Sequence, residues 1–210
     1  MNCPLCQTVA NKPFFNKDQK LFYRCGTCDG IYRDKHTYLA PKDEHKRYEN
    51  HNNDVTDIGY QNFVMPLVDQ VVTNFDANHH LGLDYGAGPG PVITKLLKDK
   101  GFSLKLYDPY FWPDATVFDL SYDFIVCCEV IEHFNSPVVE FKRLRNLLRP
   151  KGQLICKTSL YNDQVNFETW YYKNDPTHVF LYTAATLDWI AKNIGFEKME
   201  LNEKLIVFGI

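Results

Sequence analysis

The segment 81–90, LGLDYGAGPG, constrains the fold of this chain more than any other stretch. Its apolar start predicts a short buried strand, and Asp84 marks the carboxyl end of that strand. Three glycines then allow a tight turn at which the backbone can approach a ligand, and these are Gly86, Gly88 and Gly90. In an open α/β sheet, such a strand-to-helix turn lies at the edge where small molecules bind. The segment therefore predicts an α/β fold with a cofactor site at this turn.

Strand and helix patterns alternate along the rest of the domain. One apolar face predicts a helix over 64–75 that begins or bends near Pro66, and other helices are expected at 92–100, 136–148 and 183–193. Together with the strand that starts at Leu81 and ends at Asp84, strands are expected at 102–107, 116–118, 122–128, 153–159, 196–201 and 204–210. The last two predict an antiparallel hairpin. The fold class is therefore α/β, with a Rossmann-like, seven-stranded, mostly parallel sheet that ends in an antiparallel hairpin.

Four of the seven cysteines form two C-x-x-C pairs near the start of the chain, and they are Cys3, Cys6, Cys25 and Cys28. No secretory signal precedes them, so we interpret them as metal ligands rather than as two disulfides. Two such turns can complete a tetrahedron of thiolates around one ion, and zinc is favoured over iron or redox chemistry. A closed four-thiolate site has no open coordination position, which predicts a structural role. The other three cysteines lie in apolar runs and are expected in the core.

These patterns divide the chain into three parts. Residues 1–38 form a zinc-ribbon-like module, too small for a sufficient core of its own without a metal. Residues 39–57 form a charged connector, and residues 58–210 form the α/β domain. Residues 160–182 are rich in aromatic and polar side chains and show no clear periodicity.

The composition indicates a soluble protein that is not strongly basic. The chain has 210 residues and a formal net charge of −3, so no overall basic field attracts nucleic acid or an anionic membrane. No apolar run approaches the roughly 20 residues that a membrane helix needs. We therefore expect a cytoplasmic protein without a membrane partner.

The order of these motifs resembles the class I methyltransferases that use S-adenosylmethionine, over residues 58–210. LDYGAGPG resembles the family's acidic glycine motif, CCEVIEHF at 127–134 resembles the segment after its fourth strand, and RLRNLLRPKGQLI resembles its last helix-to-strand crossing. The resemblance implies that Asp84 lies near the amino-acid end of the cofactor, that Asp108 holds the ribose hydroxyls, and that Asp119 and Leu120 contact the adenine. The cofactor-binding residues it implies are Asp84, Gly86, Ala87, Gly88, Asp108, Pro109, Asp119, Leu120 and Glu129. Tyr60 is added to them because it begins the first helix, from which it could close over the cofactor. A nicotinamide dehydrogenase is the competing interpretation, but its G-x-G-x-x-G spacing differs from that of Gly86, Gly88 and Gly90.

The chemistry expected of such an enzyme is an in-line displacement at an activated methyl group, for which alignment and water exclusion supply most of the catalysis. A general base is needed only when the acceptor carries a proton of high pKa. The candidates are His133 and His178, and the alternative for His178 is a structural hydrogen bond that holds its loop. Aromatic residues at 170–172 either wall an acceptor pocket or pack beneath the loop.

The acceptor is not specified by the sequence, and a small molecule or a protein is favoured over RNA. A four-cysteine module ahead of such a domain also resembles ribosomal RNA guanine methyltransferases with a zinc-binding head, which keeps RNA as an alternative. The basic residues of the head are offset by acids and form no dense stripe. A second alternative is a non-catalytic, zinc-bearing scaffold protein.

Overall fold

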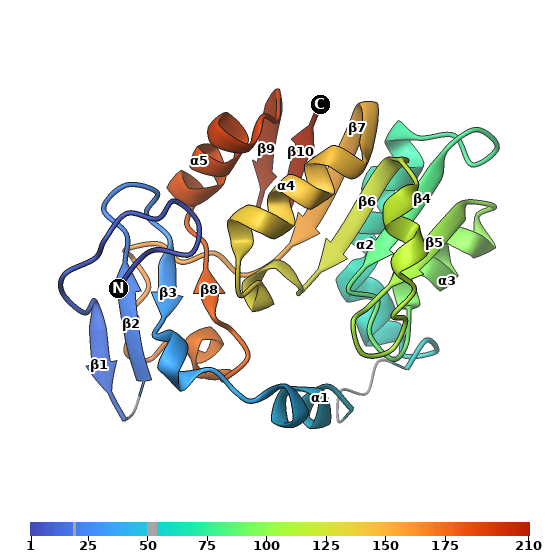
Figure 1. The fold of residues 1–210 in the computed structure, drawn as a ribbon. Helices are drawn as coiled ribbons and strands as arrows, with labels where there is room; N and C mark the ends of the chain where they lie inside the picture. The colour runs from blue at the N-terminus through green and yellow to red at the C-terminus, as the bar shows by residue number, and fades with distance from the viewer. Residues whose placement is uncertain (19, 50–53) are drawn as a thin grey trace.

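A computed structural model describes residues 1–18, 20–49 and 54–210 of the chain. Its central sheet has six strands in the order β5-β4-β6-β7-β10-β9 (Figure 1). The strands are β4 (Leu81–Tyr85), β5 (Ser103–Tyr107), β6 (Tyr122–Cys128), β7 (Leu148–Lys157), β9 (Lys198–Asn202) and β10 (Leu205–Gly209). β5, β4, β6 and β7 are parallel, whereas β10 pairs antiparallel with both β7 and β9. The predicted α/β class and the antiparallel C-terminal hairpin are confirmed.

The sheet has six strands over the described residues rather than the predicted seven. The segment 116–118, expected as a strand, lies in the 3₁₀ helix η2 (Ala115–Asp119). The carboxylate of Asp114 caps this helix by accepting hydrogen bonds from the backbone N–H and hydroxyl of Thr116, at 3.0 and 2.6 Å. This side-chain bonding gives the backbone an alternative to strand pairing, and it outweighs the strand preference of the β-branched residues that follow.

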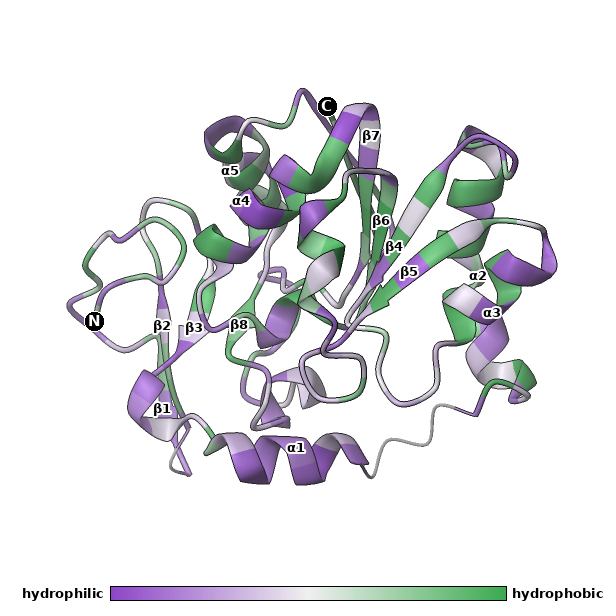
Figure 2. Ribbon diagram, turned by 45° about the vertical axis from the view of Figure 1, so that its right-hand side comes forward, coloured by the Kyte–Doolittle hydropathy of each residue, from purple (hydrophilic) through white to green (hydrophobic). Residues whose placement is uncertain are grey.

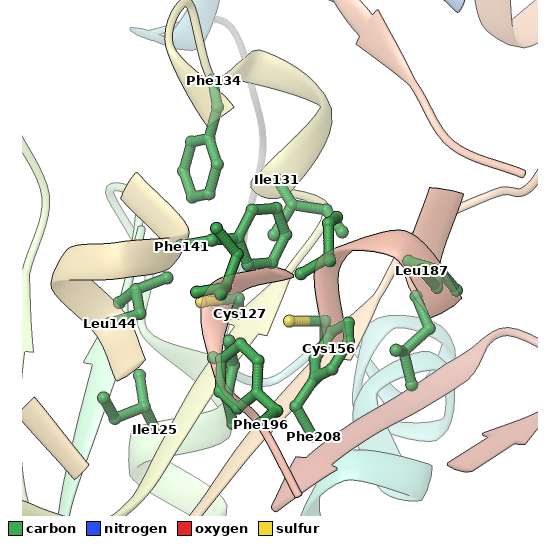
Figure 3. Close-up of a cluster of buried hydrophobic side chains, with 14 of the residues drawn as sticks. Ile125, Cys127, Ile131, Phe134, Phe141, Leu144, Cys156, Leu187, Phe196 and Phe208 are labelled. Atoms are coloured by element: carbon green, nitrogen blue, oxygen red, sulfur yellow. The ribbon is translucent and has the colours of Figure 1, made fainter. Parts of the chain in front are cut away.

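Helices cover both faces of the central sheet. α2 (Ile58–Asn74) and α3 (Val92–Asp99) pack on one face, and α4 (Pro137–Leu147) and α5 (Ala184–Ile194) pack on the other. Alternate residues of a strand face opposite layers, so Phe124 and Val126 belong to the first core, while Ile125 and Cys127 belong to the second. Figure 3 shows part of the second core, with Cys127 and Cys156 among aromatic and aliphatic side chains. The prediction of core positions for these two cysteines is confirmed.

Helix α2 begins at Ile58, ahead of Pro66, and continues through it. Its start is fixed by Asp57, whose carboxylate accepts hydrogen bonds from the N–H groups of Gly59 and Tyr60 at 2.7 and 3.3 Å. This side-chain cap satisfies amides that have no partner within the helix. None of the described helices combines the length and the apolar character needed to cross a bilayer.

A second, smaller sheet joins strands from the N-terminal part of the chain to one strand from its C-terminal half. Its antiparallel strands are β1 (Phe15–Lys17), β2 (Lys20–Arg24), β3 (Ile31–Arg33) and β8 (Phe180–Leu181), in that order. Ile31 lies opposite Leu181 and Tyr32 lies opposite Phe180, so a strand from the C-terminal half completes a sheet begun near the N-terminus (Figure 1). The segment 160–182, which lacks periodicity in the sequence, contains the short helix η4 (Tyr171–Asn174) and leads into β8.

Helix α1 (Pro41–Glu49) follows the 3₁₀ helix η1 (Lys35–Thr37) and falls within the charged connector predicted for 39–57, of which residues 50–53 lie outside the described part. Figure 2 shows α1 as largely hydrophilic, in contrast to the hydrophobic strands of the central sheet. α1 crosses below the ends of the central strands, between the small sheet and α2 (Figure 1). The connector therefore passes close to the edge at which the sequence predicts a cofactor.

Candidate active site

The glycine turn joins β4 to α3 and is tied to the neighbouring strand β5. Gly86 and Gly88 have φ values of 79° and 62°, in the left-handed region that disfavours a Cβ. The N–H groups of Gly86 and Ala87 donate to the carbonyl of Tyr107, at 2.8 and 3.1 Å. A Cβ on Gly86 would lie 2.4 Å from the Val130 side chain, so both the conformation and the close packing require glycine there.

Asp84 is a buried carboxylate at the carboxyl end of β4. It is 3% exposed, and its Oδ2 accepts a hydrogen bond from the Thr94 hydroxyl at 2.7 Å. Burial raises the pKa of Asp84 to about 6, and the nearby Asp108 acts in the same direction, whereas the Thr94 hydrogen bonds oppose the shift. A carboxyl group whose charge is left uncompensated in this way favours a positively charged ligand.

Asp108, at the end of β5, holds the glycine turn and its own loop together. Its Oδ2 accepts from the N–H of Gly88 at 3.0 Å, and its Oδ1 accepts from the N–H groups of Tyr110 and Phe111 at 2.9 and 3.1 Å. The indole N–H of Trp112 donates back to the carbonyl of Gly88 at 2.8 Å. Asp108 is therefore fixed directly beside the glycine turn that follows Asp84.

A cavity of about 910 Å³ opens at the carboxyl ends of β4, β5 and β6. Of the residues predicted from sequence, its lining includes Tyr60, Asp84, Gly86, Ala87, Gly88, Asp108, Pro109, Glu129, His133 and His178. Asp119 and Leu120 are not in the lining: both are exposed at the end of η2, where the predicted strand is replaced by a 3₁₀ turn. The predicted adenine contact by these two residues therefore has no support from the cavity geometry.

Two glutamates beyond the end of β6 share a tyrosine hydroxyl. Glu129 adopts a left-handed φ of 52°, and the short helix η3 (Ile131–His133) follows, so Glu129 and His133 are not on one face of a regular helix. The hydroxyl of Tyr172 lies 2.9 Å from Glu129 Oε2 and also contacts Glu132 Oε1, while the Thr158 hydroxyl donates to Glu132 Oε2 at 3.0 Å. Burial and mutual repulsion raise the pKa of Glu129, and burial raises that of Glu132.

The shared hydroxyl implies that this pair of glutamates holds a proton. Tyr172 has one hydroxyl hydrogen and can donate it to only one of the two carboxylates. A hydrogen on the other carboxyl group would let that group donate to the Tyr172 oxygen in turn. Two carboxylates this close cannot both ionise easily, which agrees with their raised pKa values. Sequence reasoning missed Glu132, although an acid inside the apolar run CCEVIEHF marks it.

The two predicted histidines lie beside each other, with ring centroids 4.9 Å apart. His133 Nδ1 lies 2.9 Å from the carbonyl of Thr177, and His178 Nδ1 lies 2.7 Å from the carbonyl of Tyr172. Because a carbonyl only accepts, each Nδ1 carries the hydrogen and each Nε2 keeps an unprotonated lone pair. Burial lowers the pKa of His133, and burial together with His133 lowers the pKa of His178 to about 4. Both rings are therefore neutral proton acceptors at neutral pH.

Helix α1 contributes a wall of the cavity that the sequence did not indicate. Glu44 accepts a hydrogen bond from the hydroxyl of Tyr110 at 2.9 Å, and His45 stacks on the same ring at 4.8 Å. The hydroxyl of Tyr48 lies 3.1 Å from His133 Nδ1. These contacts connect α1 to both the β5 loop and the η3 segment, so the connector covers the site.

Comparison with known proteins identifies the family of this chain. The family described as Methyltransferase domain matches residues 31–201, which is well over half of the chain. The chain belongs to the methyltransferase domain family. No curated protein matches it in sequence.

Solved structures of methyltransferases share this fold at low sequence identity. An O-methyltransferase family protein from Burkholderia thailandensis aligns with a TM-score of 0.56 and 13% identity, over 79% of this chain and 61% of its own. Human N-acetylserotonin methyltransferase in complex with SAM aligns with a TM-score of 0.54 and 16% identity, over 71% of this chain and 53% of its own. The 1,6-didemethyltoxoflavin-N1-methyltransferase of B. thailandensis, with bound 1,6-didemethyltoxoflavin and S-adenosylhomocysteine, aligns with a TM-score of 0.54 and 14% identity. This alignment covers 94% of this chain and 98% of that protein. The chain thus spans about three fifths of the length of the O-methyltransferase family protein and about half of the human enzyme. It spans nearly all of the 1,6-didemethyltoxoflavin-N1-methyltransferase.

The four predicted metal ligands of this methyltransferase-family chain are close together. Their sulfur atoms all lie within 4.8 Å of one another, with Cys3 3.5 Å from Cys28 and Cys6 3.3 Å from Cys25. The two C-x-x-C turns have the same backbone form. The N–H of Gln7 donates to the carbonyl of Cys3 at 2.9 Å, and the N–H of Asp29 donates to that of Cys25 at 3.0 Å. Gln7 and Asp29 both have left-handed φ values, 65° and 59°.

Proposed function

We propose that this protein is a class I methyltransferase that uses S-adenosylmethionine to methylate a small-molecule acceptor. The observation that carries the proposal is the cavity of about 910 Å³ at the ends of the parallel strands β4 and β5. Its lining includes Asp84, the glycine turn at 86–90 and Asp108. A cavity of this size is in the range that encloses drug-sized ligands. Family membership and the methyltransferase fold of the solved neighbours support the same assignment.

The residues at this edge fit the cofactor in charge and in shape. When bound, S-adenosylmethionine supplies a methyl group on a sulfonium centre, which is activated for displacement. The buried Asp84, which has a raised pKa, would lie toward the ammonium of the amino-acid end. Asp108 would accept from the ribose hydroxyls with the lone pairs that its three backbone donors leave free. Tyr60, Ala87, Pro109 and Glu129 complete the proposed cofactor-binding residues that line the cavity.

The two histidines in the lining of the cavity suit a protic acceptor. His133 and His178 are neutral and have unprotonated Nε2 lone pairs, so either can take the proton that a hydroxyl or amine releases on methylation. The catalytic contribution expected of the enclosure itself is alignment of the acceptor and exclusion of water. We assign the acceptor to the small-molecule class because the site is a bounded cavity, and two of the solved neighbours are named for small acceptors.

An RNA acceptor is disfavoured because basic residues near the four cysteines pair with acidic and polar side chains of the same chain. Lys17 pairs with Glu168, Lys20 donates to Asn174 at 2.9 Å, and Arg24 pairs with Asp29 and with Asp163 at 2.7 and 2.6 Å. Most of these contacts reach the segment 160–182 of the same chain. The basic side chains are therefore less available to neutralise phosphates than the sequence alone suggests.

The test is calorimetry with S-adenosylmethionine and S-adenosylhomocysteine. We expect binding of the wild-type protein, and Asp108→Asn should weaken it by about 1–3 kcal/mol through loss of a charged acceptor. Asp114→Asn is the matched control, because Asp114 makes a similar capping turn but lies outside the cavity. No heat of binding at millimolar cofactor would refute the proposed function. Equal affinities of the two variants would refute the role of Asp108.

We further propose that the four cysteines bind one structural zinc ion. Sulfur atoms 2.3 Å from a tetrahedral zinc lie about 3.8 Å apart, close to the separations of the two nearest pairs. Four thiolates would fill the coordination sphere, so the metal would stabilise the small sheet and take no part in the reaction. Metal analysis of the purified protein should find one zinc per chain, and a metal content near zero in folded protein would refute this site.

A further inference from the structure

Arg33 is a buried cation whose side-chain hydrogen bonds all reach across to the segment that carries His178. Its Nη2 donates to the carbonyls of Lys173 and Asp175 at 3.0 and 2.9 Å, and its Nε donates to the carbonyl of His178 at 3.3 Å. The residue is only 4% exposed, and its guanidinium lies 4.8 Å from the centre of the Phe22 ring. The planar guanidinium thus fixes three carbonyls of one short stretch in a single geometry.

The strand pairing holds the same stretch in register. Arg33 ends β3, and its backbone N–H donates to the carbonyl of Val179 at 2.9 Å, next to the β3–β8 pairing. The N–H of Val179 in turn donates to the carbonyl of Glu132 at 2.9 Å. The residue that follows His178 is therefore bonded on one side to the small sheet and on the other to the candidate active site.

Within the stretch 173–178, further contacts involve Tyr172, Thr177 and helix α1. His178 Nδ1 donates to the carbonyl of Tyr172, and its ring packs 4.1 Å from the Tyr172 ring. Asp175 accepts from both the N–H and the hydroxyl of Thr177, and it forms a two-point ion pair with Arg47 of α1 at 3.0 and 2.5 Å. From the small sheet, Arg33 supplies three side-chain hydrogen bonds to this stretch, and Lys20 donates to Asn174 at 2.9 Å.

We infer that Arg33 is a positioning residue that holds the backbone of residues 173–178 so that the His178 side chain faces the candidate active site. The importance of His178 in this inference rests on the proposed function. The four-cysteine segment then has a specific structural role, because by ordering β2 and β3 it presents Arg33 to the loop that carries His178. Recruitment of RNA or of a partner protein is not needed to explain its presence.

The inference is tested by the titration of His178 in Arg33→Lys, followed by ¹⁵N NMR of the imidazole rings. Lysine keeps the positive charge but loses the planar group that reaches three carbonyls, so the change reports position rather than charge. The charged or titratable groups that face His178 are Glu132, His133, Tyr172, Asp175 and residue 33, and the substitution alters the formal charge of none of them. We expect the pKa of His178 to rise from about 4 toward 6.5, by about one pH unit or more, as the ring becomes better solvated.

Arg24→Lys is the matched control, because Arg24 lies on the adjacent strand and pairs with Asp163, away from residues 173–178. It should leave the His178 titration unchanged, and His178→Gln assigns the resonance. Affinity for S-adenosylhomocysteine should stay within about twofold in Arg33→Lys, because Arg33 is absent from the cavity lining. An unchanged His178 titration would overturn the inference. So would a parallel loss of S-adenosylhomocysteine affinity, because it would mark a general structural role.

A measurement on the wild-type protein can still overturn the inference if Arg33→Lys does not fold. The Nε–H of Arg33 should exchange with solvent about tenfold or more slowly than that of Arg149, which makes a surface ion pair with Asp123. Equal exchange rates would contradict the buried geometry on which the inference depends. Failure of wild-type protein to bind S-adenosylhomocysteine would refute the proposed function alone, because neither the titration nor the exchange experiment requires a ligand.

Discussion

Replacing Asp84 with asparagine should make the protein more stable and, at the same time, weaken its cofactor binding. Asp84 is buried, and its pKa is raised from 3.8 to about 6, mainly by burial. Asparagine keeps the shape of the side chain and can still accept the Thr94 hydrogen bond, which measures 2.7 Å. The substitution removes a negative charge that the folded protein must otherwise hold in a buried position. The expected gain in the free energy of unfolding equals the free energy that burial of this charge costs the wild-type protein.

The size and sign of the effect follow from the pKa difference. Each pKa unit corresponds to about 1.4 kcal/mol, so the rise from 3.8 to about 6 is equivalent to about 3 kcal/mol. The folded state binds the proton more tightly than the unfolded state. The stabilisation that the protonated carboxyl group provides is therefore full below pH 3.8 and is lost as the pH rises through 6. Asp84→Asn should be more stable than wild type by up to about 3 kcal/mol at about pH 7.5, and this difference should shrink toward about pH 4.

Urea unfolding at several pH values between about 4 and 8 measures this difference directly. Asp69→Asn, on the exposed side of α2, is the matched control and should change the unfolding free energy by less than about 0.5 kcal/mol. The reasoning is refuted if Asp84→Asn is no more stable than this control near neutral pH, or if its advantage does not depend on pH. A stabilised variant that has lost S-adenosylhomocysteine binding would be the signature of a site that trades stability for function.

Two further predictions concern the glycine turn and the four cysteines. Gly86→Ala should destabilise the protein by about 2–4 kcal/mol, from a left-handed alanine and a clash with Val130, whereas Gly26→Ala, with no atom within 4 Å, should be nearly neutral in urea unfolding. Similar effects of the two substitutions would contradict the packing argument. Cys25→Ser should lose the bound zinc and destabilise the small sheet, while Cys127→Ala should keep one zinc per chain by metal analysis. Retention of zinc by Cys25→Ser would exclude Cys25 as a ligand.

The parts of the fold that could be predicted from sequence are those encoded by local patterns. The turn at 81–90, the parallel strands and the C-terminal hairpin each depend on residues that are adjacent in the chain. The strand prediction for 116–118 is wrong because β-branched and aromatic residues there suggest a strand, while the side chain of Asp114 caps a 3₁₀ turn instead. Capping by a single side chain decides between two backbone conformations of similar local preference.

The parts of the site that could not be predicted depend on contacts between distant segments. Helix α1 is highly charged and indicates a solvated connector, yet Glu44 meets Tyr110, 66 residues later, and Tyr48 meets His133, 85 residues later. The sequence in 160–182 shows no periodicity because the segment is ordered by the small sheet rather than by its own pattern. Glu132 is fully buried, but only the position of Tyr172 makes it a partner of Glu129. No local pattern encodes these pairings.

Five ionisable groups in or beside the cavity share one property that connects its structure to the proposed chemistry. Burial raises the pKa values of Asp84, Glu129 and Glu132 and lowers those of His133 and His178, so each group is shifted toward its neutral form. A ligand with a sulfonium and an ammonium supplies the positive charge that the acids lack, and its arrival favours their ionisation. The neutral histidines stay ready to accept a proton. A site that combines uncompensated acids with uncharged bases is therefore suited to bind a cationic methyl donor and to deprotonate a neutral acceptor.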